Sequence, residues 1–153
     1  MELILWRHAE AAEGTPDEMR ALTDKGRRQA ERMAHFISGR LPPNTRILVS
    51  PALRAQQTVA ALTTHFITAP NVGTHATPQT ALAAAGWPMA GGSVMLVGHQ
   101  PWMGELASLL MTGQPDSSII WSVKKGAIWW FSRREREGDY QTVLRLAISP
   151  DQL

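Results

Sequence analysis

The chain has 153 residues, of which 44% are apolar and 18% charged, and it carries a net charge of +2 at neutral pH. This length and composition are typical of a globular protein and exclude a fibrous or largely disordered chain. The absence of cysteine excludes disulfides and thiolate metal sites. We expect a single domain spanning residues 1–153.

The distribution of charge argues against nucleic-acid and membrane partners. The basic residues Arg133, Arg134 and Arg136 alternate with acids, which favours a solvated loop over a nucleic-acid patch. The first residues run straight into strand-like sequence without a basic targeting region, and no apolar stretch reaches the ~20 residues that span a bilayer. We therefore expect a cytoplasmic protein that binds neither nucleic acid nor membrane.

The first half of the chain alternates strand-like and helix-like segments. Residues 3–6 predict a buried strand that ends at Arg7 and His8, and the acidic segment 10–20 predicts an exposed loop. Thr23 can cap a helix that continues to about Gly39, with apolar residues on one face. The next elements predicted are a strand over 46–49 and a helix over 52–66.

The second half continues this alternation and then changes. Residues 72–77 suggest a short strand, 77–92 a short helix and loop, 93–97 a strand, and 101–112 a helix that begins at a proline. Two apolar runs, 127–131 and 140–148, predict an edge hairpin joined by a charged segment. The pattern indicates a three-layer α/β/α fold with a mainly parallel sheet.

Polar residues follow three of the predicted strands. Arg7 and His8 follow the first, Ser50 and Arg54 the second, and His99 the strand over 93–97. Because parallel strands end at one edge of a sheet, we expect these side chains to converge. With no carboxylate among them, the two arginines, the two histidines and the N-terminus of the helix after His99 predict a phosphoryl pocket.

One of the two histidines can act as a nucleophile, because a neutral imidazole forms and releases a phosphoramidate. The other histidine and the arginines would then neutralise the charge of the phosphoryl group. The alternative is that His8 and His99 bind a metal, but two guanidiniums would repel a cation and carboxylate ligands are scarce. We expect no metal and no other cofactor.

These residues occur in four motifs that together resemble the histidine phosphatase superfamily. The motifs are Arg7-His8-Ala9, Leu22-Thr23 with Gly26, Ser50-Pro51-x-x-Arg54-Ala55-x-Gln57-Thr58, and Gly98-His99-x-Pro101. The resemblance implies a phosphoglycerate mutase-like fold, phosphorylation of His8, and binding of the phosphoryl group by Arg7, Arg54 and His99. Arg20 lies where members of this group carry a basic residue, and we predict that it lines the rim of the phosphate pocket.

Within the superfamily, the chain resembles the SixA-type phosphohistidine phosphatases. Members that hydrolyse phosphate esters usually carry an acidic residue between the second strand and the later strand, whereas this chain has no Asp or Glu between Arg32 and Gly104. An alkoxide leaving group needs a proton from such an acid. Imidazole, with a reference pKa of about 6.5, leaves without a strong acid.

The sequence therefore predicts a phosphohistidine phosphatase, acting in signal transduction on a phosphohistidine-bearing protein such as a phosphotransfer domain and releasing inorganic phosphate. Two alternatives stay open. One is a small-metabolite phosphomonoesterase whose acid is Glu10, Glu13 or Asp17 from the first loop. The other is a phosphate-binding module without turnover. Lys124 and Lys125, before the hairpin, fit a solvated turn better than a contact for an acidic partner.

Overall fold

A six-stranded mixed sheet forms the centre of the molecule in a computed structural model that describes residues 1–114 and 121–153. The strand order is β3-β2-β4-β1-β5-β6. Strands β3, β2, β4 and β1 are parallel to one another, β5 is antiparallel to β1, and β6 is antiparallel to β5. The strands are β1 (Glu2–Arg7), β2 (Arg46–Val49), β3 (Ile67–Thr68), β4 (Ser93–Gly98), β5 (Ile128–Arg136) and β6 (Asp139–Ile148).

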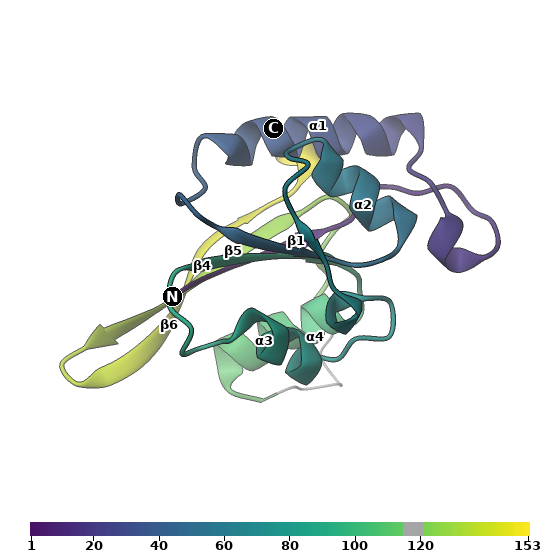
Figure 1. Cartoon of the computed structure of the whole chain (residues 1–153). Coiled ribbons are helices and arrows are strands. Elements are labelled where there is room, and N and C mark those ends of the chain that lie inside the picture. Colours follow the sequence, from purple (N-terminus) through teal and green to yellow (C-terminus); the bar gives the residue numbers. More distant parts are fainter. Residues whose placement is uncertain (115–120) are drawn as a thin grey trace.

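Helices cover both faces of this sheet (Figure 1). Helices α1 (Asp24–Ser38) and α2 (Leu53–Ala60) lie on one face, and α3 (Pro78–Ala85) and α4 (Trp102–Thr112) on the other. The arrangement confirms the predicted three-layer α/β/α fold with a mainly parallel sheet and an edge hairpin. Within the described ranges, no helix is long and apolar enough to cross a membrane.

The alternation of side chains along β1 produces two separate apolar cores. Leu3 and Leu5 pack against the α3–α4 layer, whereas Ile4 and Trp6 pack against the α1–α2 layer, and all four are fully buried. A central parallel strand is covered on both faces, which explains why residues 3–6 are apolar without interruption.

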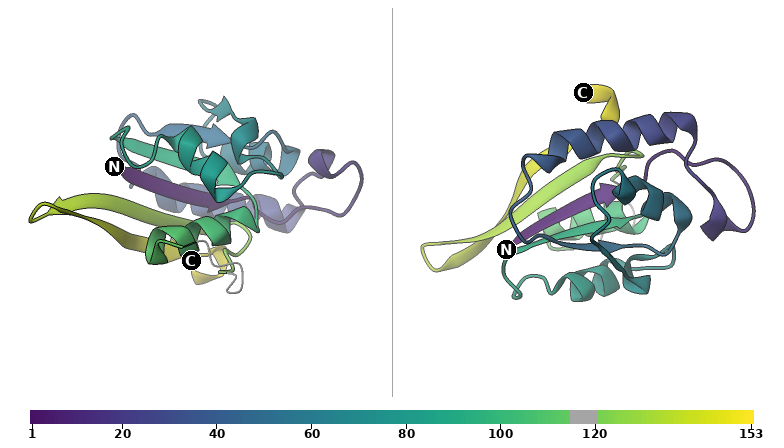
Figure 2. Two further views of the ribbon diagram at one scale, coloured as in Figure 1. Left: turned by 90° about the horizontal axis from the view of Figure 1, so that it is seen from below. Right: turned by 45° about the horizontal axis from the view of Figure 1, so that its top comes forward.

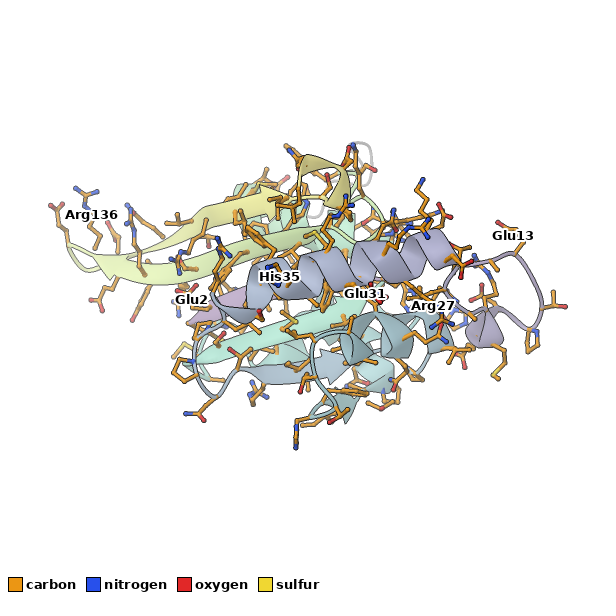
Figure 3. All side chains as sticks on the ribbon, turned by 90° about the horizontal axis from the view of Figure 1, so that it is seen from above. Glu2, Glu13, Arg27, Glu31, His35 and Arg136 are labelled. Atoms are coloured by element: carbon orange, nitrogen blue, oxygen red, sulfur yellow. The ribbon has the colours of Figure 1, made fainter. Side chains whose placement is uncertain are left out.

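Helix α1 confirms the predicted cap and amphipathic pattern. The Thr23 side chain accepts a hydrogen bond from the backbone N–H of Gly26 at 2.9 Å. Figure 3 views the molecule from the α1 side and shows Arg27, Glu31 and His35 along the outer face of this helix. The opposite, apolar face packs on the sheet.

The segment between β2 and β4 differs from the prediction at two points. Helix α2 ends at Ala60 rather than near residue 66. Beyond this end, the N–H of His65 donates to the hydroxyl of Thr63 at 3.0 Å in place of a helical bond. The prediction of a strand over residues 72–77 is wrong. The strand that pairs with β2 is β3, and Pro70–Val72 forms a 3-10 turn instead.

The predicted hairpin is confirmed, but its arms are longer than the apolar runs. The charged residues 133–136 belong to β5, and the connection shrinks to Glu137 and Gly138, both with positive φ. Beyond the apolar core, pairing of the two backbones continues the hairpin past the body of the protein (Figure 2).

Gly98, the last residue of β4, packs too tightly for a side chain. A Cβ atom there would lie 2.3 Å from Cζ2 of Trp102 and 2.9 Å from the carbonyl oxygen of Val72. We expect Gly98→Ala to lower the free energy of unfolding by about 1–3 kcal/mol through overpacking, as measured by urea denaturation. Gly39→Ala is the control, because a Cβ at Gly39 meets nothing within 4 Å. Equal stability of the two variants would contradict this account.

Candidate active site

Strand pairing brings the polar residues together at one edge of the sheet. In the β1–β4 pair Arg7 lies opposite Gly98, so His8 and His99 leave neighbouring strands side by side, with their ring centroids 5.1 Å apart. Ser50 follows β2, which pairs with the other side of β4. The predicted convergence of the three strand ends is confirmed.

His8 is buried and neutral at pH 7. Its Nδ1 lies 2.7 Å from the carbonyl oxygen of Ala9. Because a carbonyl oxygen only accepts, Nδ1 carries the proton and Nε2 keeps its lone pair. The pKa of His8 is lowered to about 4, mainly by burial and in addition by the charges of Arg54, Arg7 and Arg20, against the opposing hydrogen bond to Ala9. The result is an unprotonated imidazole nitrogen among cations.

His99 is held by a neighbouring strand end. Its Nε2 lies 2.7 Å from the Ser50 hydroxyl, whose oxygen also accepts the backbone N–H of Ala52 at 3.2 Å. The hydroxyl can donate to Nε2, and the proton of neutral His99 then sits on Nδ1. Burial, with a smaller repulsion from His8 and Arg54, lowers the pKa of His99 to about 3.

Both arginines are anchored through their terminal nitrogens. Arg7 donates from Nη1 to the carbonyl oxygen of Val123 at 2.8 Å. Arg54, in the first turn of α2, donates from Nη1 to the carbonyl oxygen of Asp17 at 2.8 Å. Burial, followed by repulsion from Arg54, lowers the pKa of Arg7. Each guanidinium is thereby oriented before any substrate arrives.

Three buried side-chain nitrogens lack a hydrogen-bond partner in the described part of the chain, and all three belong to this site. They are Arg7 Nε, Arg54 Nε and His99 Nδ1. A buried unpaired donor costs about 1–3 kcal/mol. All three belong to the residues gathered at the strand ends, and unpaired donors there are suited to an acceptor-rich anion such as a phosphoryl group.

Thr58 connects the loop after β1 to α2. Its hydroxyl accepts the backbone N–H of Ala9 at 3.0 Å and donates to the carbonyl oxygen of Arg54 at 2.7 Å. The backbone of His8 is fixed on its other side by the N–H of Gly126, which donates to the His8 carbonyl at 3.0 Å. Thr58 belongs to the third motif, but the motif does not indicate this contact. Val123 acts through its backbone carbonyl, which leaves no signal in the sequence.

The strand-end residues include no carboxylate, but Asp17, one of the three first-loop acids left open as an alternative, reaches Arg54. Asp17 Oδ2 lies 3.0 Å from Arg54 Nη2, and Asp17 Oδ1 lies 3.0 Å from Arg20 Nη1. Hydrogen bonds from Arg20 and Arg54 lower the pKa of Asp17. Asp17 is therefore an anion at neutral pH and a poor proton donor. The sequence does not show which first-loop acid reaches Arg54, because this contact depends on the path of the loop.

Arg20 is held on the same loop. Its Nε donates to the carbonyl oxygen of Ala12 at 2.8 Å, and its contact with the site runs through Asp17. Glu10 accepts a hydrogen bond from Thr23 at 3.0 Å, and Glu13 is exposed. Across residues 1–114 and 121–153, no group of three or more His, Asp or Glu side chains has an arrangement that could hold a metal ion.

Comparison with known proteins identifies the class. The model of the histidine phosphatase superfamily (branch 1) matches residues 3–72. An uncharacterized protein of Picosynechococcus sp. is 32% identical over 143 residues, which cover 84% of this chain and 82% of that protein. The chain belongs to the histidine phosphatase superfamily, and it is accordingly a phosphatase, a hydrolase with the phosphoglycerate mutase-like α/β fold.

The similarity extends to SixA proteins. The phosphohistidine phosphatase SixA of Escherichia coli (strain K12) is 29% identical over 127 residues, which cover 74% of this chain and 76% of that protein. A structure of the protein histidine phosphatase SixA complexed with tungstate superposes with a TM-score of 0.79 at 25% identity and covers 99% of both chains.

The low pKa of His8 can be measured directly. We expect the ring nitrogens of His8 to titrate near pH 4, more than two units below the reference of about 6.5, and Nδ1 to be the protonated nitrogen of the neutral ring. Nitrogen-15 NMR across an acid titration reports both properties, with the His8→Asn variant assigning the signal. A midpoint near 6.5, or a proton on Nε2, would contradict the buried, oriented imidazole.

Asp17 competes with any anion for Arg54. We expect Asp17→Asn to bind inorganic phosphate about tenfold more tightly, which corresponds to ~1.4 kcal/mol, because the amide removes a negative charge without removing the side chain. Isothermal titration calorimetry measures the affinity, and Glu13→Gln makes the same charge change at an exposed position of the same loop. Equal affinities in the two variants would refute the competition.

Proposed function

We propose that this phosphatase removes phosphoryl groups from protein phosphohistidine through a phosphorylated His8 intermediate. The observation that carries the proposal is the site at the strand ends, which combines three unpaired buried donors with the unprotonated Nε2 of His8. Donors placed in advance where charge gathers stabilise phosphoryl transfer without reorganisation during the reaction. Arg7, Arg54 and His99 are the phosphate-binding residues, and Arg20 contributes through Asp17 at the rim.

The reaction takes place in two displacements at phosphorus. In the first, the lone pair of His8 Nε2 forms a P–N bond while the P–N bond to the substrate imidazole breaks. The other ring nitrogen of the substrate carries a proton from solvent, so the group leaves as neutral imidazole. In the second, water attacks the phosphorus of phospho-His8, loses its proton, and breaks that P–N bond. The products are inorganic phosphate and free His8.

The chemical class of the leaving group can be inferred from whether the site holds a proton donor. Asp17 is the carboxylate placed at the arginines, and its two ion pairs keep it ionised. A site without a ready proton donor favours a leaving group that departs without one, and imidazole is such a group. The similarity to E. coli SixA, which carries the name phosphohistidine phosphatase, supports the same substrate class.

The ester-hydrolysing alternative keeps one point in its favour. Asp17 is held by half-buried Arg20 and buried Arg54, but 56% of its own side chain is accessible, so a substrate that displaced it from Arg54 would restore some of its basicity. A non-catalytic binding module would share the donors but has no use for a neutral, oriented His8 nucleophile.

A matched pair of peptides tests the substrate class. We expect much faster release of phosphate from a phosphohistidine peptide than from the same peptide with phosphoserine at that position. His8→Ala should abolish release because it removes the attacking nitrogen. The intermediate, trapped by rapid denaturation, should be a phosphate on His8 that is labile to acid and stable to alkali.

Each alternative has its own outcome. Preferred turnover of phosphoserine, lost in Asp17→Asn, would establish the esterase and overturn the proposal. Phosphate binding with no turnover and no trapped intermediate would establish a binding module. His65→Ala serves as the control, since His65 lies on the loop between α2 and β3, away from the site.

A further inference from the structure

An open cavity adjoins the candidate site through Arg7. Its volume is about 410 Å³, and it lies between the end of β1, the first turn of α1, the segment before β5 and the C-terminal turn. The charged residues that line it are Arg7, Glu10, Lys25, Lys124, Lys125 and Asp151. Four cations thus face two anions beside a pocket that is itself cationic.

The two adjacent lysines have fixed backbone positions relative to the reacting centre. Ala127 N–H donates to the carbonyl oxygen of Lys124 at 2.9 Å, which closes a β-turn with Lys125 and Gly126 at its corners. Gly126 has φ of +77°, as this turn requires. The same residue donates to the carbonyl oxygen of His8 at 3.0 Å. The turn is therefore attached to His8 itself.

The two acids of the cavity do not neutralise it. Glu10 lies 3.7 Å from Lys25, and Asp151 lies 3.2 Å from Lys124. Both lysines have 65% of their side chains exposed. An exposed pair of this kind contributes only about 0–1 kcal/mol, so an incoming carboxylate can replace either partner at little cost.

The positive surface continues along α1. A neighbouring cavity of about 260 Å³ shares Lys25 and Asp151 with the first and adds Arg28 and Arg32. The cations therefore come from three segments of the chain that the fold assembles. This spread suits a broad surface better than one small molecule, and flexible ammonium groups suit carboxylates that need no bidentate geometry.

We propose that Lys25, Lys124 and Lys125 form a basic rim that binds acidic side chains flanking the phosphohistidine of the protein substrate. The inference rests on the proposed function and assigns the chemistry of the surface that the enzyme recognises. Lys124 and Lys125 lie in an exposed turn, as predicted, and the proposal gives that turn a partner. The rim attracts the partner and sets its orientation, while the buried donors hold the phosphoryl group.

Two phosphohistidine peptides of one sequence provide the test, one with glutamates flanking the phosphohistidine and one with glutamines at those positions. For the unmodified enzyme we expect kcat/KM to be higher for the glutamate peptide. Lys125→Glu, and separately Lys25→Glu, should lower the ratio of the two kcat/KM values by about 5- to 10-fold, mainly through KM. Lys25 lies in the first turn of α1, where a glutamate favours the helix, so this second variant guards against misfolding.

Arg136→Glu is the matched control. It makes the same charge change at the tip of the hairpin, at the opposite end of the molecule from Glu13 and the first loop (Figure 3). We expect this variant to retain the ratio of the unmodified enzyme. Raising the salt concentration should lower that ratio in the unmodified enzyme, because exposed charges are screened.

The outcomes separate the two proposals. Hydrolysis of both peptides at equal kcat/KM, or an equal fall of the ratio in Lys125→Glu and Arg136→Glu, would overturn the basic rim and leave the proposed function intact. Hydrolysis of neither peptide by an enzyme that hydrolyses phosphate esters would overturn the proposed function, and the rim with it.

Discussion

The register of β1 against β4 is the constraint on which the rest of the site depends. The backbone N–H of His8 donates to the carbonyl oxygen of Gly98 at 3.0 Å, and this single bond continues the ladder past the last paired residues, Arg7 and Gly98. It places the two histidine rings beside each other at the carboxyl edge of the sheet. A slip by one residue would turn one ring to the other face of the sheet.

Burial of that edge determines its chemistry. Two guanidiniums and two imidazoles removed from water and placed together cannot all be charged, and the histidines are the groups that lose their protons. A depressed pKa leaves an imidazole with the free lone pair that a nucleophile needs at neutral pH. Asp17 offsets part of the remaining positive charge and restricts access to Arg54 at the same time. The contact of Asp17 with Arg54 therefore stabilises the site when no substrate is bound and opposes the binding of a substrate anion.

Sequence patterns predicted the parts of the fold that depend on local order. The apolar strands, the Thr23 cap and the edge hairpin follow from periodicity and turn chemistry, and each is confirmed. The errors lie between residues 60 and 77, where no strong period exists and pairing with β2 determines which short segment becomes β3. The sequence names Asp17 only as one of three first-loop acids that could reach the site. Its contact with Arg54 could not be singled out, because it joins residues 37 positions apart through an irregular loop.

The sequence by itself determined the residue types of a phosphoryl site and the strand ends that carry them, because strand-end positions follow from local pattern and the carboxyl edge of a parallel sheet is a general meeting point. The tertiary structure alone decided which nitrogen of His8 is free, which donors stay unpaired, and where the Lys124–Lys125 turn lies relative to Arg7. Those properties depend on burial and on contacts between distant segments, and neither is encoded in the spacing of residues along the chain.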